Sequence, residues 1–344
     1  MTMPAARKRA TALVAGLIGV ALAVSGCGSD AAESDASAAP SSASFPVTVD
    51  TAYGDVTVKA KPKRIVALGT RHVELLNVLD EKPVAFADYG LDAEQLLTSY
   101  PWMEGKYPGE PQTGLFTAEF QPSPEKIAAL EPDLILTTIW QTDEELYKQL
   151  SQIAPTYVGI DMKTNTTWQD DLAALAEFTG HDSKIVDDEQ SKLDAALDAA
   201  AKRLPGLQGK TFYAAALGDG DQLWLTEYAA DPILGLGLKA GEGQPVDGSQ
   251  AADAPKFSQE NLDRLTADVV FIAAENRDPS GKFRAALEAD PRLSTLPAAK
   301  NGTLMFLEPG QWNAVNGGSA ASLTWWVDDV VPALEKSALN QGGQ

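Results

Sequence analysis

The chain has 344 residues, which is enough to bury two hydrophobic cores of ordinary size. Its 48 acidic residues outnumber 27 basic ones and give a formal net charge of −21. That balance disfavours nucleic acid and anionic lipid as binding partners. One cysteine excludes an internal disulfide and a Cys-based metal cluster, and two histidines are too few for a poly-His site. These counts argue against a directly held metal, and we expect no cofactor.

The N-terminus has the parts of an export signal. A basic start precedes an apolar run of 14 residues, Thr11–Val24, which is too short to span a bilayer. Val24-Ser25-Gly26-Cys27 follows and resembles a bacterial lipobox, although an ordinary cleavage site beside a stray cysteine is the alternative. We predict a signal peptide over residues 1–26. Residues 27–44 are then a lipidated Cys27 and a flexible tether, because Ala, Ser, Asp and Glu cannot build a core.

Residues 45–180 have the pattern of an α/β lobe. A buried strand over Ile65–Leu68, a helix over His72–Leu79 and a strand over Val84–Ala87 form a β-α-β unit, which predicts a parallel sheet with a right-handed crossover. The other expected elements of this lobe are an edge hairpin within Val47–Val58, a loop over Gly90–Phe120, helices over Glu144–Ile153 and Trp168–Phe178, and a strand over Thr156–Ile160.

One segment occurs twice. Pro122–Leu136 has the pattern of a short helix followed by a buried strand, and Phe257–Phe271 aligns with it without a gap, 135 residues later. Two copies of one supersecondary unit suggest two related lobes. The matching polar pairs are Ser123 with Ser258, Glu125 with Glu260, and Asp133 with Asp268. Each Glu has a plain explanation, since the dipole of the first helical turn favours a carboxylate.

The middle of the chain predicts one long helix over residues 181–204, capped by Asp182, and we interpret it as a strut between the lobes. Residues 205–344 then form a C-terminal α/β lobe. Its expected elements are strands over Thr211–Ala216, Leu223–Leu225 and Thr303–Leu307, helices over Lys282–Glu288 and Ser319–Leu334, and a loop around Gln311–Asn313. Gly235–Ala240 matches a dinucleotide fingerprint, but a helix runs into it, which favours a helix C-cap.

Candidate ligand contacts gather where the strands of the predicted sheets end. Ligands of parallel α/β sheets bind at the carboxyl ends of the strands. Aromatic side chains there can stack on a ligand, and an arginine can hold an anionic one. Each tryptophan could instead be part of a core, and each arginine could form a surface salt bridge. The candidates are Arg71, Tyr89, Trp140, Trp224, Tyr228, Arg277 and Trp312.

The lipobox, the tether and the segments PKRIVALGT, PSPEKIAALEPDLIL, FSQENLDRLTADVVF and LPAAKNGTLMFLEPGQW together resemble the ferric-siderophore-binding lipoproteins of ABC importers. The resemblance implies a class III periplasmic-binding-protein fold, with two Rossmann-like lobes joined by a single long helix. It also implies a monomer that captures a ferric siderophore between its lobes. In that family a Glu from each lobe docks on the permease, and the matching positions are Glu125 and Glu260.

The resemblance implies a binding protein rather than an enzyme, located outside the cytoplasm and anchored to the membrane by Cys27. Hydroxamate binders of the family often have an Arg shortly before the first repeated segment, whereas residues 114–118 contain none, which argues against a hydroxamate site. Three alternatives stay open at this point. The same fold could bind cobalamin or haem, the protein could be a surface enzyme using Glu275, or it could be a structural envelope lipoprotein.

Overall fold

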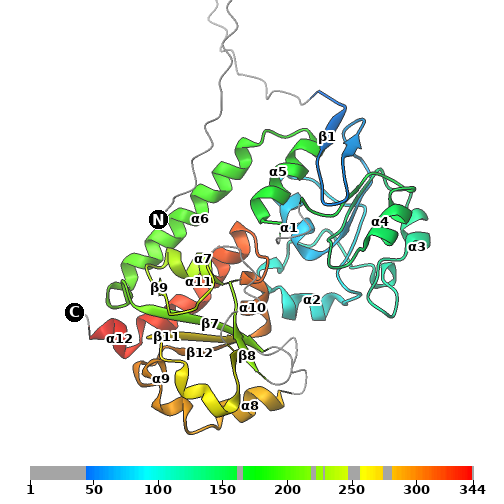
Figure 1. Ribbon diagram of the computed structural model, residues 1–344. Coiled ribbons are helices and arrows are strands. Elements are labelled where there is room, and N and C mark those ends of the chain that lie inside the picture. Colours follow the sequence, from blue (N-terminus) through cyan, green and yellow to red (C-terminus); the bar gives the residue numbers. More distant parts are fainter. Residues whose placement is uncertain are drawn as a thin grey trace, which may run out of the picture. The chain divides into compact units, whose positions relative to one another are not determined.

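The computed structural model describes residues 44–160, 166–217, 222–227, 229–246, 256–273 and 281–342. These segments form two α/β lobes joined by one long helix (Figure 1). The predicted signal peptide, Cys27 and all but the last residue of the tether lie outside the described residues. Among the residues described, no helix is both long and apolar enough to cross a bilayer.

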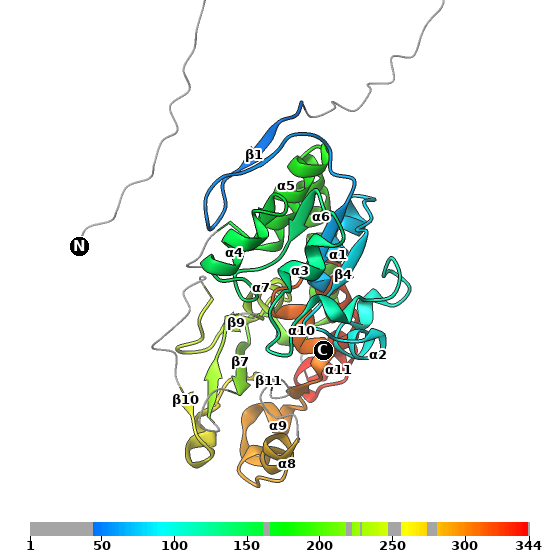
Figure 2. The ribbon, with the colours of Figure 1, turned by 90° about the vertical axis from the view of Figure 1, so that its right-hand side faces the viewer.

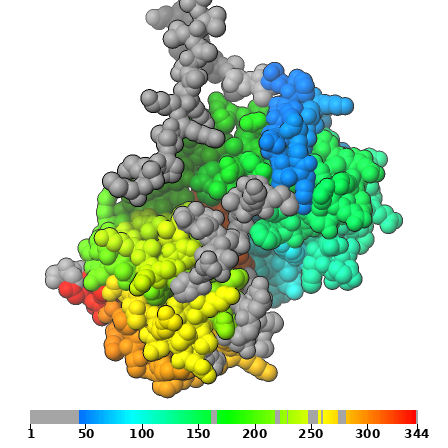
Figure 3. Space-filling model, in the orientation of Figure 1, coloured from blue at the N-terminus to red at the C-terminus, as the bar shows by residue number. Residues whose placement is uncertain are grey.

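The N-terminal lobe is built on a four-stranded parallel sheet with the strand order β4-β3-β5-β6. Its strands are β3 (Ile65–Leu68), β4 (Ala85–Ala87), β5 (Leu134–Leu136) and β6 (Thr156–Tyr157). Its helices are α1 (Thr70–Val78), α2 (Ala93–Ser99), α3 (Pro124–Ala128), α4 (Glu144–Leu150) and α5 (Trp168–Thr179), with short 3₁₀ turns η1 (Pro101–Met103) and η2 (Thr113–Leu115). The antiparallel hairpin of β1 (Val47–Val49) and β2 (Val56–Val58), blue in Figure 3, lies on the surface. The predicted hairpin and parallel sheet are therefore confirmed.

Both faces of this sheet are buried, as its unbroken apolar strands predict. Ile65 and Ala67 face one hydrophobic cluster, while Val66 and Leu68 face the other, in keeping with the two-residue period of a strand. The first of these clusters continues through the helices between the lobes and into the C-terminal lobe, where it includes Trp326.

The connection between the lobes is α6 (Lys184–Arg203), which has 20 residues and spans about 30 Å. It packs against α5 and against α11 (Ala320–Glu335), and Figures 1 and 2 show it running from one lobe to the other. The predicted helix is thus present, but its N-cap is Ser183 rather than Asp182. Asp182 lies one residue earlier and accepts a 2.9 Å hydrogen bond from the backbone N–H of Lys184. The domain limits that we drew around it stay predictions.

The C-terminal lobe has a six-stranded mixed sheet in the order β10-β8-β7-β11-β12, with β9 also paired to β7. Its strands are β7 (Thr211–Leu217), β8 (Leu223–Leu225), β9 (Lys239–Ala240), β10 (Lys256–Phe257), β11 (Val269–Ala273) and β12 (Leu304–Leu307). Its further helices are α7 (Ala230–Gly235), α8 (Lys282–Glu288), α9 (Pro297–Asn301), α10 (Pro309–Val315) and α12 (Ala338–Gln341), with 3₁₀ turns η3 (Pro205–Leu207), η4 (Gln259–Arg264) and η6 (Leu293–Thr295). The strand β8 pairs antiparallel with both β7 and β10, so it runs in the opposite direction to the other described strands of this sheet.

Three local predictions are wrong. Gln311–Asn313 lies inside α10, where Glu308 and Gln311 form a capping box that a loop assignment overlooked. Gly90–Phe120 contains α2, which Asp92 and Gln95 cap in the same way. The helix of the second repeated segment is the 3₁₀ turn η4, and its backbone is non-helical at Asn261. The predicted C-cap is present, because α7 ends at Gly235 and Gly237 has a φ of 89°.

Candidate functional site

A cavity of about 650 Å³ lies at the carboxyl ends of the N-terminal sheet. Each of the four parallel strands contributes the residues that follow it, and the segment from Asn313 to Gly318 of the C-terminal lobe completes the wall. This position is where ligands of parallel α/β sheets bind. The volume is in the range of sites that enclose a ligand of several hundred daltons. The four strands are followed in the wall by Thr70–His72, Asp88 and Tyr89, Thr137–Gln141, and Val158 and Gly159.

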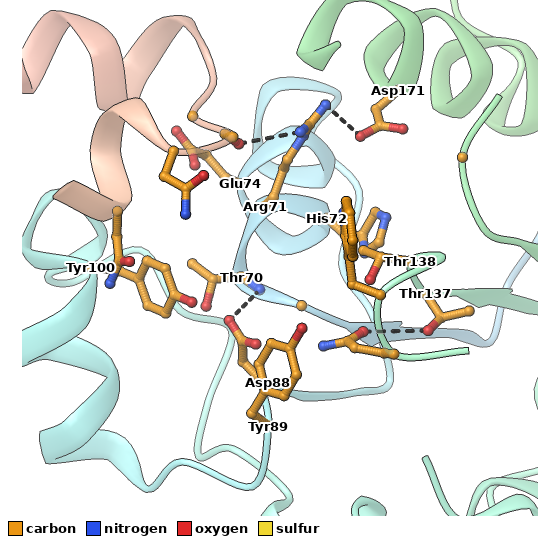
Figure 4. A pocket seen from close by; sticks show the side chains of 18 of the residues that line it. Thr70, Arg71, His72, Glu74, Asp88, Tyr89, Tyr100, Thr137, Thr138 and Asp171 are labelled. Atoms are coloured by element: carbon orange, nitrogen blue, oxygen red, sulfur yellow. Dashed lines mark hydrogen bonds and ion pairs between the residues drawn. The ribbon is translucent and has the colours of Figure 1, made fainter. Parts of the chain in front are cut away.

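Arg71 forms a network that ties three parts of the chain together (Figure 4). Its guanidinium makes a 2.7 Å ion pair with Asp171 of α5, whose other carboxylate oxygen accepts a 2.6 Å hydrogen bond from the Tyr157 hydroxyl. It also donates to the backbone carbonyls of Thr166, at 2.7 Å, and Gly317, at 3.3 Å. Burial raises the pKa of Asp171, and Arg71 opposes that rise. The ion pair therefore favours the charged form of a buried carboxylate beside the cavity.

Glu74 connects the lobes. This buried carboxylate of α1 accepts hydrogen bonds from the Trp102 indole at 3.1 Å, from the Ser319 hydroxyl, and from the backbone N–H of Ser322 at 3.2 Å. Ser319 and Ser322 form the capping box of α11. Burial raises the Glu74 pKa, while these hydrogen bonds partly lower it. A carboxylate at a helix N-terminus is favourable, so Glu74 fastens α11 to the N-terminal lobe.

Asp88 and the tyrosines around it form the floor of the cavity. The carboxylate accepts a 3.0 Å hydrogen bond from the backbone N–H of Thr70 and a hydrogen bond from Tyr100. In Figure 4 the rings of Tyr89 and Tyr100 lie on either side of it. Burial raises the pKa of Asp88 and, together with this carboxylate, raises the Tyr100 pKa well above its usual range. The floor thus presents neutral hydroxyls around one buried acid.

His72 is buried next to Arg71, and its Nδ1 has no hydrogen-bond partner within the described part of the chain. Burial lowers its pKa to about 3, and the neighbouring Arg71 charge adds to the effect. The imidazole is therefore neutral near pH 7 and brings no positive charge to the cavity.

Two aromatic side chains on the cavity wall reach solvent. Trp140 is 66% exposed and Tyr89 is 38% exposed, whereas most other large apolar side chains of this lobe are buried. Trp140 follows β5, and Tyr89 follows β4 with a positive φ of 45°. A left-handed residue other than glycine is uncommon and is found at functional sites. Both rings offer faces on which a ligand could stack.

Comparisons with known proteins decide the family. The family model described as "Periplasmic binding protein" matches residues 65–309, which is most of the chain. The chain belongs to this periplasmic binding protein family. Its members are substrate-binding proteins, and the structure has the two-lobed class III architecture that the sequence predicts, so the predicted fold class is confirmed.

Several relatives of this periplasmic binding protein are named for ferric complexes. It is 24% identical over 300 residues to the ferric-anguibactin-binding protein FatB of Vibrio anguillarum, covering 84% of this chain and 88% of that one. It is 29% identical over 281 residues to the ferric enterobactin-binding periplasmic protein FepB of Escherichia coli, and the match covers 77% of this chain and 84% of that one.

Solved structures establish the same fold. Staphylococcus aureus SirA complexed with staphyloferrin B superimposes with a TM-score of 0.65 at 22% identity, covering 84% of this chain and 98% of that one. A periplasmic solute binding protein from Mycobacterium smegmatis gives a TM-score of 0.65 at 23% identity, covering 84% and 97%.

In this periplasmic binding protein the predicted contact residues fall into three groups. Arg71, Tyr89 and Trp140 lie together on the cavity wall. Trp224, on β8, is 40% exposed, and Trp312, inside α10, is only 7% exposed; neither is among the lining residues described. Tyr228 and Arg277 lie outside the described residues, as does Glu275. Glu125 and Glu260 are exposed in the first turns of α3 and η4. The roles of all these residues stay predictions.

Sequence reasoning missed three acids of this site. Asp88 directly follows a strand, so the rule that selected Tyr89 could also have selected it. Asp171 lies in the first turn of α5, where a carboxylate is ordinary. No sequence pattern pointed to Glu74, since its partner Ser319 is 245 residues away along the chain.

Proposed function

We propose that this protein is the extracytoplasmic receptor of an ABC importer and captures an iron(III)–siderophore complex in the cavity between its lobes. The observation that carries the proposal is a 650 Å³ cavity at the carboxyl ends of the N-terminal sheet, with the exposed ring of Trp140 on its wall. Relatives named for ferric anguibactin and ferric enterobactin support the ligand class.

The physical basis of capture in this proposal is stacking together with many hydrogen bonds. Trp140 and Tyr89 cover apolar faces of the chelate, while the hydroxyls and amides of the wall bond its oxygens. Burying one tryptophan ring contributes at most about 4–6 kcal/mol before ordering costs, and micromolar affinity needs about 8 kcal/mol. Two rings and several hydrogen bonds are therefore sufficient. The chemistry calls for no covalent step and no cofactor.

The second part of the proposal concerns delivery. Lipidated Cys27 holds the protein on the outer face of the cell membrane, and the tether leaves the lobes free to reach a permease. Glu125 on one lobe and Glu260 on the other then engage basic sites on that permease. Both side chains are exposed and lie in equivalent positions of the repeated segment, which supports this assignment.

The test is a titration of the mature protein, followed by tryptophan fluorescence. The ligands are a ferric hydroxamate, a ferric catecholate, ferric citrate, haem and cobalamin, each compared with its iron-free form where one exists. We expect saturable quenching by at least one ferric chelate at micromolar concentration or below. Quenching by haem or cobalamin alone would assign the protein to a different ligand, and no quenching by any compound would remove the proposal.

A further inference from the structure

The charge of the cavity wall is a property that the proposed function leaves open. Arg71 is the only arginine or lysine among the described residues that line the cavity. Three acids, Glu74, Asp88 and Asp171, line it as well. The other polar side chains of the wall are neutral hydroxyls and amides, and neutral His72 adds no charge.

The positive charge of Arg71 is already matched within the protein. Its ion pair with Asp171 is 2.7 Å long, and the backbone carbonyls of Thr166 and Gly317 each accept one further N–H from its terminal nitrogens, while its Nε has no hydrogen-bond partner in the described part of the chain. Asp171 holds a buried position with Tyr157 as its second partner, so it cannot withdraw when a ligand enters. An anionic chelate that drew Arg71 away from Asp171 would leave a buried carboxylate uncompensated.

Asp88 also disfavours an anionic ligand. It is 3% exposed, lines the cavity, and has hydrogen-bond donors as partners rather than a cation. In its ionised form this carboxylate repels an anion that enters the cavity. Like charges close together in a partly desolvated site repel much more strongly than in water.

The segments outside the described ranges are also acidic in composition. The five internal segments outside the described ranges contain seven acidic and two basic residues in the sequence. The whole chain has a net charge of −21, which repels anions until salt screens the field beyond about 8–10 Å.

From these observations we infer that the bound chelate carries no net negative charge, so the ligand class is uncharged or positively charged ferric chelates of the hydroxamate type. This inference rests on the proposed function and narrows it. The missing arginine in residues 114–118, which argued against a hydroxamate site, removes one possible contact only. A hydroxamate chelate without negative charge needs hydrogen bonds and stacking, and the wall offers both through residues such as Thr138, Gln141 and Trp140.

The experiment compares chelates that differ in charge. Ferrioxamine B is singly positive, its N-succinyl derivative has the same scaffold with a single negative charge, and ferric enterobactin is triply negative. We expect the succinyl derivative to bind about tenfold more weakly than ferrioxamine B, and ferric enterobactin about 100-fold more weakly. Repeating the titrations at about 1 M salt screens the long-range repulsion from the net charge of the protein. The difference in affinity that remains is due to the charges of the cavity wall.

Two variants locate the discrimination. Asp171→Asn releases Arg71 from its ion pair, and Asp88→Asn removes a second acid of the wall. Each should narrow the difference in affinity between the positive and negative chelates about tenfold. Asp170→Asn is the matched control, because this exposed neighbour on α5 is not part of the wall and should leave the gap unchanged. Thermal melts establish that each variant is folded, and Asp88→Asn serves alone if Asp171→Asn unfolds.

The outcomes separate this inference from the function beneath it. If the negative chelates bind as tightly as ferrioxamine B, or more tightly, the charge inference is wrong and the siderophore function stands. If no ferric chelate of any charge binds, the proposed function fails and the inference fails with it.

Discussion

The two copies of the repeated segment share one structural device. Asp133 precedes β5 and accepts 2.8 Å hydrogen bonds from the backbone N–H groups of Lys63 and Arg64, just before β3. Asp268 precedes β11 and accepts 2.9 Å hydrogen bonds from the backbone N–H and the hydroxyl of Thr211, at the start of β7. In both lobes the aspartate thus fastens the start of one parallel strand to the start of its neighbour.

The copies differ in the helix. The first forms α3, with Pro124 at the first helical position, and the second forms the 3₁₀ turn η4. The buried apolar positions are nevertheless kept, since Ile127 and Leu262 are both fully buried. The two copies therefore share their buried apolar contacts and the aspartate, whereas the type of helix differs between them. The exposed Glu of each copy has no part in either. The dipole of the first helical turn is one explanation for its repetition, and the proposed docking on the permease is the functional reason.

The largest expected effect tests that reason. Glu125→Ala combined with Glu260→Ala should reduce uptake of the ferric chelate in cells at least about 100-fold, because both contacts with the permease are lost. Chelate affinity of the purified variant should stay within about twofold of the original, since neither residue is among those that line the cavity. Uptake assays and fluorescence titrations measure the two quantities.

A control pair for this experiment has the same change of charge. Glu119→Ala combined with Asp263→Ala removes one exposed acid from each lobe, at positions close in sequence to Glu125 and Glu260, and should leave uptake unchanged. Equal losses in both double variants would mean that net charge, rather than docking, determines uptake.

The aspartates provide the second test. Asp268→Ala should lower the free energy of unfolding by about 2–3 kcal/mol, since this partly buried group serves both a backbone N–H and the Thr211 hydroxyl. Asp133→Ala, at a more exposed site, should lower it by about 1–2 kcal/mol. Urea unfolding provides both values. A larger loss at Asp133 than at Asp268 would contradict the ranking by burial.

Buried His72 of the N-terminal lobe predicts a pH effect. Its pKa is about 3 in the folded protein and about 6.5 when unfolded, so only the unfolded state takes up a proton as the pH falls below 6.5. Folding stability should therefore decrease with acid, by about 2 kcal/mol at pH 5. His72→Gln should lose this component while the control His181→Gln keeps it. Denaturant titrations at pH 7.5 and 5 measure the free energy of unfolding of each protein. An equal change of this free energy with pH in His72→Gln and in the original protein would contradict the role of His72.

The smallest expected effect compares a tryptophan of each lobe. Trp140→Ala should weaken chelate binding about tenfold through lost stacking, because its ring is on the cavity wall. Trp224→Ala, at a less exposed tryptophan on β8 that is not among the lining residues described, should change affinity less than about twofold. Since both changes remove a fluorophore, calorimetric titration is the appropriate measurement. A comparable loss for Trp224→Ala would extend the contact surface to the C-terminal lobe.

Sequence patterns predicted the parts of this molecule that depend on local chemistry. Apolar runs located β3, β5 and β11, and the rule of carboxyl ends brought Arg71, Tyr89 and Trp140 to one wall. What the patterns could not supply is pairing between distant residues. Glu74 with Ser319, and Arg71 with Asp171, join positions far apart in the chain, and no spacing within either segment encodes the partner.

The helices α10 and α2 show a second limit of the same kind. Their capping boxes, at Glu308 and Asp92, are readable in the sequence, but prolines and glycines around them resemble loop composition more than helix composition. Tertiary packing then stabilises these short helices against each other, since α2 and α10 are in contact.

The most direct test of the central claim is the position of the iron. A crystal of the protein with ferrioxamine B, measured at the iron absorption edge, gives an anomalous peak that locates the metal without reference to the protein atoms. The account predicts one peak inside the cavity, between Trp140 and the segment that includes Asn316. A peak elsewhere on the protein, or saturating binding in solution with the cavity empty in the crystal, would contradict it.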